Sequence, residues 1–385
     1  MRYSDSSSPH MRRDLGRRAG ETMRVTMDTL SKREPDIDVR KVGAPAVDTP
    51  TRRNESGTTD RKTLWKAAIK VPMYTVALSP MVVATACCYY DHGVVSWTTL
   101  AMLLGAGVAI IAWLNVSNDV FDFETGIDKN KRESVVNLLG GDRRARNTGM
   151  LIAQLFLLVG LLLLIGVCYV PQAKAFDWTP LVLILFAVGW GYSYQGPPFR
   201  LGYYGVGEPI CFMTWFISTC AAYYAQAPSA DARSIEQGLR YLWSQLGPRA
   251  NSSLMLGALQ VSTVTTIILF CSHFHQEKDD LAAGKRSPIV RLGLYKACMV
   301  LTVACAFLHV CALAGTLYRD YLVWPFVIVT IATLPATRDL ILFAWTNYAE
   351  PEKIRPLKYY AVVLNFCYSM VLSAAMILTR KYLIQ

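Results

Sequence analysis

The chain has 385 residues, of which 53% are hydrophobic and 17% are charged, and its formal net charge at pH 7 is +11. So small a charged fraction excludes an ordinary soluble domain and is typical of a protein with many membrane-spanning helices. The ten cysteines are scattered, form no C-x-x-C pair and lie mostly in apolar runs. We therefore expect neither a disulfide framework nor a thiolate metal site.

Residues 1–60 differ in composition from the rest of the chain, because they are polar and carry many charges of both signs. This composition predicts a disordered segment. Serines and arginines near its start are typical of an organelle transit peptide, whereas the acids Asp5, Asp14 and Glu21 count against one. A disordered tail and a transit peptide therefore both stay open.

Residues 61–385 are predicted to form one membrane domain. A spanning helix needs roughly 20 mostly apolar residues, and lipid cannot satisfy the backbone of other structures. Nine stretches qualify, although two prolines interrupt the eighth: 71–90, 97–118, 149–170, 180–196, 206–225, 252–273, 296–317, 322–344 and 358–379. The sequence thus predicts an all-α integral membrane protein with nine transmembrane helices.

The connections between these stretches carry unequal charge. Lys and Arg are concentrated on the side of residues 61–70 and of the even-numbered connections. The positive-inside rule places this basic side toward the compartment from which the protein inserts. On the opposite side the longest connection is 227–250, in which 234–246 could form a short amphipathic interfacial helix.

One acidic pattern occurs twice, each time at the basic end of an apolar run. The copies read Asn118-Asp119-x-x-Asp122-x-x-x-Gly126 and Gln276-Glu277-x-x-Asp280-x-x-x-Gly284. Helical spacing places the polar residues of each copy on one face, and Asn115 extends the first face by one turn. Mg²⁺ is usually held by a few carboxylates, water and substrate phosphate. The repeat therefore predicts a shared Mg²⁺ site that binds a diphosphate.

Basic and aromatic residues near the two copies could bind the same diphosphate. The basic residues that follow the copies are Lys129, Lys131, Arg132, Lys285 and Arg286. Between the fourth and fifth stretches, Tyr192, Tyr194 and Arg200 are further candidates for these contacts. An interfacial aromatic belt is the alternative interpretation of tyrosines in this segment. His273 and His275 share no helical face, so we expect no metal role for the pair.

Three segments resemble the UbiA superfamily of intramembrane prenyltransferases, and most of all its branch that prenylates 1,4-dihydroxy-2-naphthoate in cyanobacteria and plastids. They are NDVFDFETGIDKNKRESVVNLLGG from Asn118, GYSYQGPPFRLGYYGVGEPICF from Gly191 and HFHQEKDDLAAGKRSPIVRLG from His273. The resemblance implies nine helices around a central cavity. It implies metal ligation by Asn118, Asp119, Asp122, Asp128, Glu277, Asp279 and Asp280. Among these, Asp119, Asp122 and Asp280 are the expected catalytic residues. The chain departs from the family at Gln276, where an acid is usual.

The function that this resemblance implies is Mg²⁺-dependent transfer of a phytyl or polyprenyl group from its diphosphate to 1,4-dihydroxy-2-naphthoate with decarboxylation, as in phylloquinone or menaquinone biosynthesis. The expected partners are these two substrates and the lipid bilayer, with no nucleic acid, and the expected location is a chloroplast membrane. A homogentisate-type prenyltransferase is the alternative among enzymes. A cation-coupled transporter and a non-catalytic membrane scaffold are the alternatives from other classes. The sequence leaves the prenyl length open.

Overall fold

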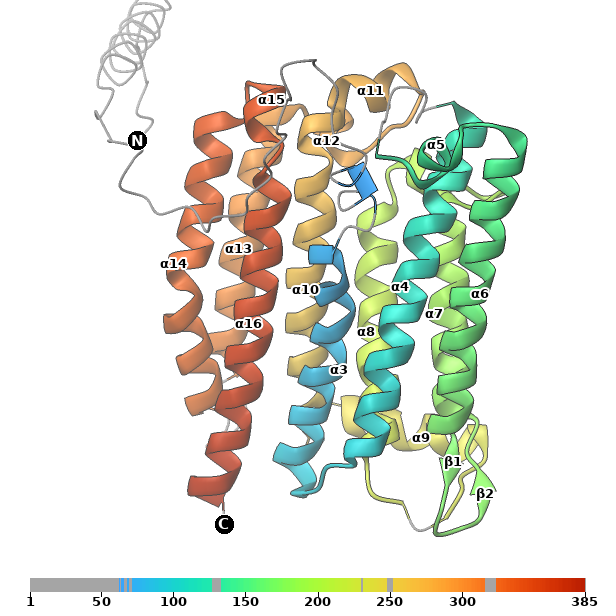
Figure 1. The fold of residues 1–385 in the computed structure, drawn as a ribbon. Helices are drawn as coiled ribbons and strands as arrows, with labels where there is room; N and C mark the ends of the chain where they lie inside the picture. Colours follow the sequence, from blue (N-terminus) through green and yellow to red (C-terminus); the bar gives the residue numbers. More distant parts are fainter. Residues whose placement is uncertain are drawn as a thin grey trace, which may run out of the picture. The chain divides into compact units, whose positions relative to one another are not determined.

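The computed structural model describes residues 71–126, 133–229, 231–247, 252–315 and 323–384, together with Lys62, Leu64, Trp65 and Ala68. The predictions for residues 1–60 lie outside these residues. Each of the predicted apolar stretches corresponds to a long helix, and these helices lie side by side in Figure 1. The long helices are α3 (Val71–His92), α4 (Trp97–Thr125), α6 (Arg143–Val167), α7 (Thr179–Gln195), α8 (Gly207–Gln226), α10 (Leu254–Ser272), α13 (Leu294–Gly315), α14 (Val323–Asn347) and α16 (Leu357–Thr379).

The fold is that of an all-α integral membrane protein. Six helical segments of the described residues are long and apolar enough to cross a membrane, judged by length and composition. They are Trp97–Thr125, Arg143–Val167, Leu254–Ala282, Leu294–Leu313, Trp324–Asn347 and Pro351–Tyr382. The number of nine membrane crossings therefore stays a prediction.

Two helices extend beyond their predicted bounds toward the basic side. Helix α6 begins at Arg143 rather than near 149, because the Asp142 side chain caps it by accepting a hydrogen bond of 2.7 Å from the Ala145 N–H. Helix α4 continues past 118 to Thr125 and ends at Gly126, whose φ of +78° is the left-handed conformation that glycine adopts readily. The polar residues of the first acidic pattern therefore all lie on regular helix.

Short elements connect the long helices at both ends of the bundle (Figure 1). The basic end carries α5 (Val135–Leu139), η2 (Leu201–Tyr204), η3 (Phe274–Gln276), α11 (Glu277–Ala282), α12 (Pro288–Leu292) and α15 (Pro351–Ile354). The opposite end carries strands β1 (Tyr169–Val170) and β2 (Ala175–Phe176) and helix α9 (Ile235–Leu246), and the chain ends in η4 (Arg380–Ile384). Helix α9 confirms the short helix expected at 234–246, and it starts with a capping box between Ser234 and Gln237.

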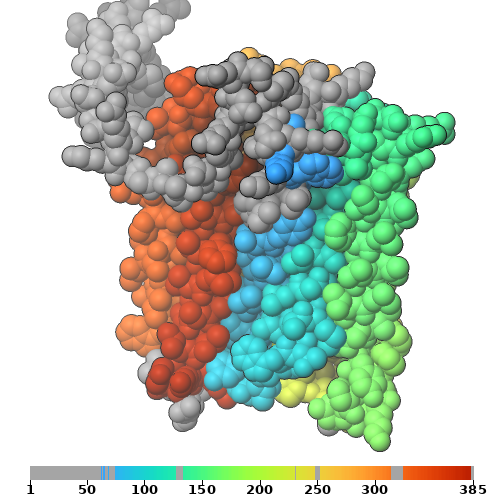
Figure 2. All heavy atoms as spheres, in the orientation of Figure 1, coloured from blue at the N-terminus to red at the C-terminus, as the bar shows by residue number. Residues whose placement is uncertain are grey.

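Neighbouring helices pack closely along the bundle. Helix α4 packs on α6 and α3, and α3 packs on α16, so these four lie side by side across the face in Figure 2. A buried amide joins three helices, because Asn365 of α16 accepts from Ser79 of α3 at 2.7 Å and donates to Thr265 of α10 at 2.9 Å. Such hydrogen bonds between helices stabilise membrane bundles, where lipid offers no alternative partner.

A close approach between α3 and α10 leads to a stability prediction. A Cβ atom added at Gly257 would lie 2.5 Å from Cys87 Sγ, whereas one added at Gly189 of α7 would meet nothing within 4 Å. We expect Gly257→Ala to lower the free energy of unfolding by about 1–3 kcal/mol through overpacking. Gly189→Ala should leave it unchanged or slightly raised. Thermal unfolding in one detergent compares the two variants, and equal melting temperatures would contradict this account of the α3–α10 contact.

Candidate active site

The first acidic pattern occupies the last turns of α4. Asp119 is 1% exposed, and its Oδ2 accepts a hydrogen bond of 3.0 Å from the N–H of Val135, the first residue of α5. A carboxylate at a helix N-terminus is favourable because of the partial positive charge there. Asp119 therefore also has a structural role, since it holds α5 against the end of α4.

The second acidic pattern departs from the continuous helix that its spacing suggests. Helix α10 ends at Ser272, η3 follows, and Glu277 starts the separate helix α11. Gln276 therefore lies at a break between two helices. Asp280 is buried, Glu277 is partly buried, and Asp279 is exposed. Of the three acids, Asp280 is therefore the one enclosed by protein.

Asp280 is paired with a buried cation. Its Oδ1 lies 3.3 Å from Lys285 Nζ, and its backbone carbonyl accepts a hydrogen bond of 2.8 Å from the Lys285 N–H. Gly284, with a φ of +72°, turns the chain between them. Asp280 Oδ2 is buried and has no hydrogen-bond partner in the described part of the chain. The pair thus leaves one acidic oxygen available to a ligand.

The segment between α7 and α8 contacts both acidic patterns. On the side of the second pattern, the Tyr203 carbonyl accepts a hydrogen bond of 2.8 Å from the Arg286 N–H. Arg291 reinforces this contact by donating to the carbonyls of Tyr204 at 2.5 Å and Arg286 at 3.2 Å. On the side of the first pattern, the Tyr203 hydroxyl donates to Thr125 Oγ1 at 3.4 Å. Residues 201–205 therefore connect the loop after α11 with the end of α4.

The charges of both acidic patterns affect the pKa of Tyr203. Burial raises the pKa of Tyr203, and the negative charges of Asp122 and Asp280 raise that pKa further, while Arg200 lowers it. Carboxylates separated by 158 positions in the sequence thus act on one side chain. Together with the contacts of Tyr203 to Thr125 and Arg286, this places both patterns near one segment at the basic end of the bundle.

The segment between α7 and α8, here called the middle segment, holds three predicted ligand contacts. They differ in whether their polar atoms already have hydrogen-bond partners within the protein. The Tyr192 hydroxyl donates to the Pro197 carbonyl at 2.8 Å, so it is used within its own segment. The Tyr194 hydroxyl lies 3.4 Å from His273 Nε2. Arg200, at a φ of +45°, has a buried Nε with no hydrogen-bond partner in the described ranges. Arg200 thus keeps a donor for an anion.

Several predicted site residues remain without a test. Asp128, Lys129, Lys131 and Arg132 lie outside the described residues. Within the described ranges, no three His, Cys, Asp or Glu side chains form a group that could hold a metal ion, so the ligand set expected for Mg²⁺ stays a prediction. The unpaired Asp280 Oδ2 is nevertheless the hard oxygen that Mg²⁺ prefers. The carboxylate oxygens of the described acidic residues are therefore of the chemical type that binds Mg²⁺.

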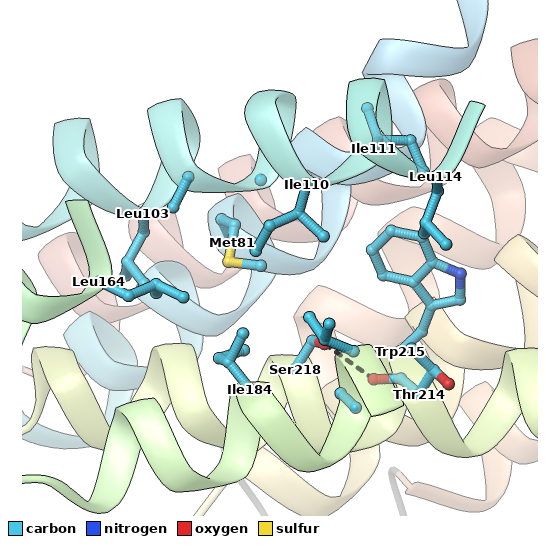
Figure 3. Close-up of a pocket in the computed structure, with 14 residues that line it drawn as sticks. Met81, Leu103, Ile110, Ile111, Leu114, Leu164, Ile184, Thr214, Trp215 and Ser218 are labelled. Atoms are coloured by element: carbon cyan, nitrogen blue, oxygen red, sulfur yellow. Dashed lines mark hydrogen bonds between the residues drawn. The ribbon is translucent and has the colours of Figure 1, made fainter. Parts of the chain in front are cut away.

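An apolar cavity lies along the middle of α4 and ends at Leu114, one helical turn before Asn118 (Figure 3). Its volume is about 50 Å³, and side chains of α3, α4, α6, α7 and α8 line it. Leu114 lies at one end, next to Asn115, whose side-chain Nδ2 is buried and unpaired among the described residues. Leu103, Ile110 and Ile184 continue the apolar lining along α4 and α7. Along α4, the apolar cavity is therefore followed by the polar residues of the first pattern.

Sequence reasoning missed two buried residues of this region. The Glu208 carboxylate at the start of α8 lies 3.2 Å from His273 Nδ1, and their side chains are 13% and 4% exposed. No local spacing links positions 65 residues apart. The one available signal was that both lie in the segments that resemble the prenyltransferases.

Comparisons with known proteins match most of this chain. The sequence pattern of the UbiA prenyltransferase family matches residues 77–374. A 2-carboxy-1,4-naphthoquinone phytyltransferase from Synechocystis is 43% identical over 81% of this chain and 92% of its own length. A chloroplastic protein of the same name from Arabidopsis thaliana is 37% identical over 83% of this chain and 78% of its own length.

Solved structures share the fold at low sequence identity. A UbiA homolog from Aeropyrum pernix has a TM-score of 0.56 and 14% identity, with 78% of this chain and 97% of that chain covered. A UbiA homolog from Archaeoglobus fulgidus, solved with GPP and Mg²⁺, has a TM-score of 0.50 and 14% identity, with 81% and 99% covered.

The contact between the middle segment and the second pattern leads to a prediction. Gly205 and Gly293 have nearly equal φ values of +71° and +74°, but only at Gly205 would an added Cβ meet the Arg286 carbonyl. Alanine carries strain of about 1–2 kcal/mol at Gly205, which is left-handed with a ψ of 27°, and at least as much at Gly293, whose ψ of 155° lies in a region that essentially only glycine adopts. We expect Gly205→Ala alone to release the loop after α11 and to accelerate tryptic cleavage after Arg286, measured by mass spectrometry. Equal cleavage rates in the two variants would contradict this role of Gly205.

Proposed function

Because the chain belongs to the UbiA prenyltransferase family, we propose that it transfers a phytyl or longer polyprenyl group from its diphosphate to 1,4-dihydroxy-2-naphthoate. The observation that carries the proposal is that Tyr203 joins the end of α4, through Thr125, to the loop after α11, through Arg286. The acids of both patterns thereby lie near one segment, Asp280 is paired with Lys285, and Arg200 keeps a donor that is free within the described residues, an arrangement suited to a diphosphate with its metal ion.

The names of the relatives support a carboxylated naphthoquinone skeleton as acceptor. The reduced form of this skeleton is the one that suits the chemistry. Attack on an allylic cation requires an electron-rich ring, and the two hydroxyl groups of the dihydroxynaphthoate donate electron density that the quinone withdraws. We therefore assign the reduced acceptor to this chain.

The reaction needs no base to remove a proton from the ring carbon, because carbon dioxide leaves from that carbon. The allylic C–O bond breaks and its electron pair leaves with the diphosphate. The ring carbon that bears the carboxylate forms the new C–C bond. Carbon dioxide then departs, and the electrons of its bond restore the aromatic ring.

Departure of the diphosphate is the step that the charged residues assist. Asn118, Asp119, Asp122, Asp128, Glu277, Asp279 and Asp280 would hold Mg²⁺, which supplies positive charge to the leaving diphosphate when bound. A related structure solved with GPP and Mg²⁺ supports this choice of ion. The Arg200 guanidinium and the Lys285 ammonium add hydrogen bonds to the diphosphate oxygens.

The apolar part of the donor needs a dry environment. We assign it to the cavity that starts at Leu114 and runs between α4 and α7. At about 50 Å³ this cavity is too small for a phytyl chain, so its walls must separate when the donor binds. Exclusion of water there protects the allylic cation from hydrolysis.

The cellular setting completes the proposal. The protein is an integral membrane protein, and the name of the plant relative supports a plastid membrane. Residues 61–385 would form the catalytic membrane domain, and residues 1–60 would be a tail or transit peptide.

The first pattern can be tested with two neighbouring acids of α4. Asp122→Asn should lower the rate of prenyl transfer about 100-fold or more, because charge that stabilises the leaving group is lost. Glu124→Gln is the matched control, since the Glu124 carboxylate accepts a hydrogen bond of 2.8 Å from Arg146 on the periphery of the bundle. Purified protein with phytyl diphosphate, reduced acceptor and Mg²⁺ gives the rates by mass spectrometry. Wild-type turnover by Asp122→Asn would contradict the proposed site, and transfer to homogentisate alone would contradict the acceptor.

Metal removal provides a separate prediction. Treatment of the wild-type protein with EDTA should abolish transfer, and added Mg²⁺ should restore it, because the charge on the diphosphate would otherwise remain unbalanced. Full activity in excess chelator would contradict the metal requirement.

A further inference from the structure

A buried imidazole joins two side chains beside the proposed active site. His273, at the end of α10, lies 3.2 Å from Glu208 Oε1 through Nδ1 and 3.4 Å from the Tyr194 hydroxyl through Nε2. With a proton on Nδ1 donated to the Glu208 carboxylate, Nε2 accepts from Tyr194. Three helices, α7, α8 and α10, thus contribute one hydrogen-bonded chain.

The surrounding backbone leaves Tyr194 little freedom to move. A Cβ atom added at Gly202 or Gly207 would lie 2.8 Å or 2.6 Å from Tyr194 Cε2. The glycines flank the segment that contacts both acidic patterns, so this segment holds the Tyr194 ring. The chain from Tyr194 to Glu208 is therefore fixed relative to the site.

The second oxygen of Glu208 is unused. The Glu208 side chain is only 13% exposed, and its Oε2 is buried with no hydrogen-bond partner among the described residues. A buried carboxylate oxygen without a donor is energetically costly. Lys285, which follows the second pattern, is engaged with Asp280. The Glu208 oxygen can therefore accept a hydrogen bond from a ligand.

The two proposed substrates offer few donors. A prenyl diphosphate and the acceptor carboxylate present only acceptor oxygens, as do the carbonyls of the quinone. The ring hydroxyls of the reduced acceptor are the donors that remain.

We propose that Glu208 accepts a hydrogen bond from a ring hydroxyl of the aromatic acceptor, and that His273 positions Glu208 for this contact. The site thereby selects the reduced, hydroxyl-bearing acceptor over the quinone, whose carbonyl oxygen the carboxylate repels. This inference rests on the proposed function for the identity of the acceptor. It adds Glu208 as the residue that distinguishes the reduced acceptor from the quinone.

Equilibrium binding to the full-length protein in nanodiscs tests this selectivity without turnover. The ligands are 1,4-dihydroxy-2-naphthoate kept reduced under nitrogen, the corresponding 2-carboxy-1,4-naphthoquinone, and the two monohydroxy-2-naphthoates that lack one hydroxyl each. Wild-type protein should prefer the reduced ligand to the quinone, and removal of one particular hydroxyl should weaken binding about tenfold or more.

Glu208→Gln is the decisive variant. It should weaken binding of the reduced ligand by a similar factor and narrow the preference over the quinone, because an amide can donate to a carbonyl. The analogue that lacks the recognised hydroxyl should bind Glu208→Gln as tightly as it binds the wild type. His273→Gln should lose part of the same preference, while the affinity for prenyl diphosphate stays unchanged in both variants. Glu236→Gln, at an exposed acid of α9, is the control.

Two results would overturn the proposal. One is a folded Glu208→Gln protein, judged by its melting temperature, that retains the wild-type preference. The other, which needs no variant, is wild-type protein that binds the reduced ligand, both analogues and the quinone equally. Wild-type protein that shows the predicted preference but transfers no prenyl group would contradict the proposed function alone.

Discussion

The contacts of Tyr203, which join the end of α4 to the loop after α11, are the interaction on which the basic end of this bundle depends. The Tyr203 hydroxyl donates to Thr125 and its carbonyl accepts from the Arg286 N–H, while the negative charges of Asp122 and Asp280 both raise its pKa. Cations beside these acids offset part of their negative charge. Lys285 is buried against Asp280, and Arg200 lies close enough to lower the pKa of Tyr203. A metal ion with its diphosphate would complete the balance.

Helix α4 joins this concentration of charge to the apolar part of the bundle. Helix α4 changes along its length from the lining of an apolar cavity at Leu114 to the acidic residues of its last turns. Buried amide and hydroxyl groups such as Asn365 and Ser79 hold the helices together. In the proposed reaction, this one helix would contact both the apolar and the charged part of the prenyl diphosphate.

Much of this organisation could be predicted because it is encoded locally. Apolar runs identified the long helices, and the spacing of Asn118, Asp119 and Asp122 identified a helical face that the structure retains in α4. The family itself was recognisable from three segments, and the comparisons confirm it. These features depend on residues within a few turns of one another.

The remaining features depend on tertiary contacts that no local pattern encodes. The break between α10 and α11 separates Gln276 and Glu277 from the preceding helix, and the hydrogen bond from Val135 gives Asp119 a structural role. The pairing of Glu208 with His273 arises where α8 meets α10. The expected ligand set for Mg²⁺ stays a prediction.

A thermodynamic cycle on the affinity for prenyl diphosphate tests most directly whether the two acidic patterns form one site. Binding of a non-hydrolysable prenyl diphosphate analogue with Mg²⁺ would be measured for the wild type, Asp122→Asn, Asp280→Asn and the double variant. Residues that share one ligand are strongly coupled, whereas independent sites are additive. We expect each single variant to lose most of the affinity and the double variant to lose little more. Losses that simply add would contradict a single site.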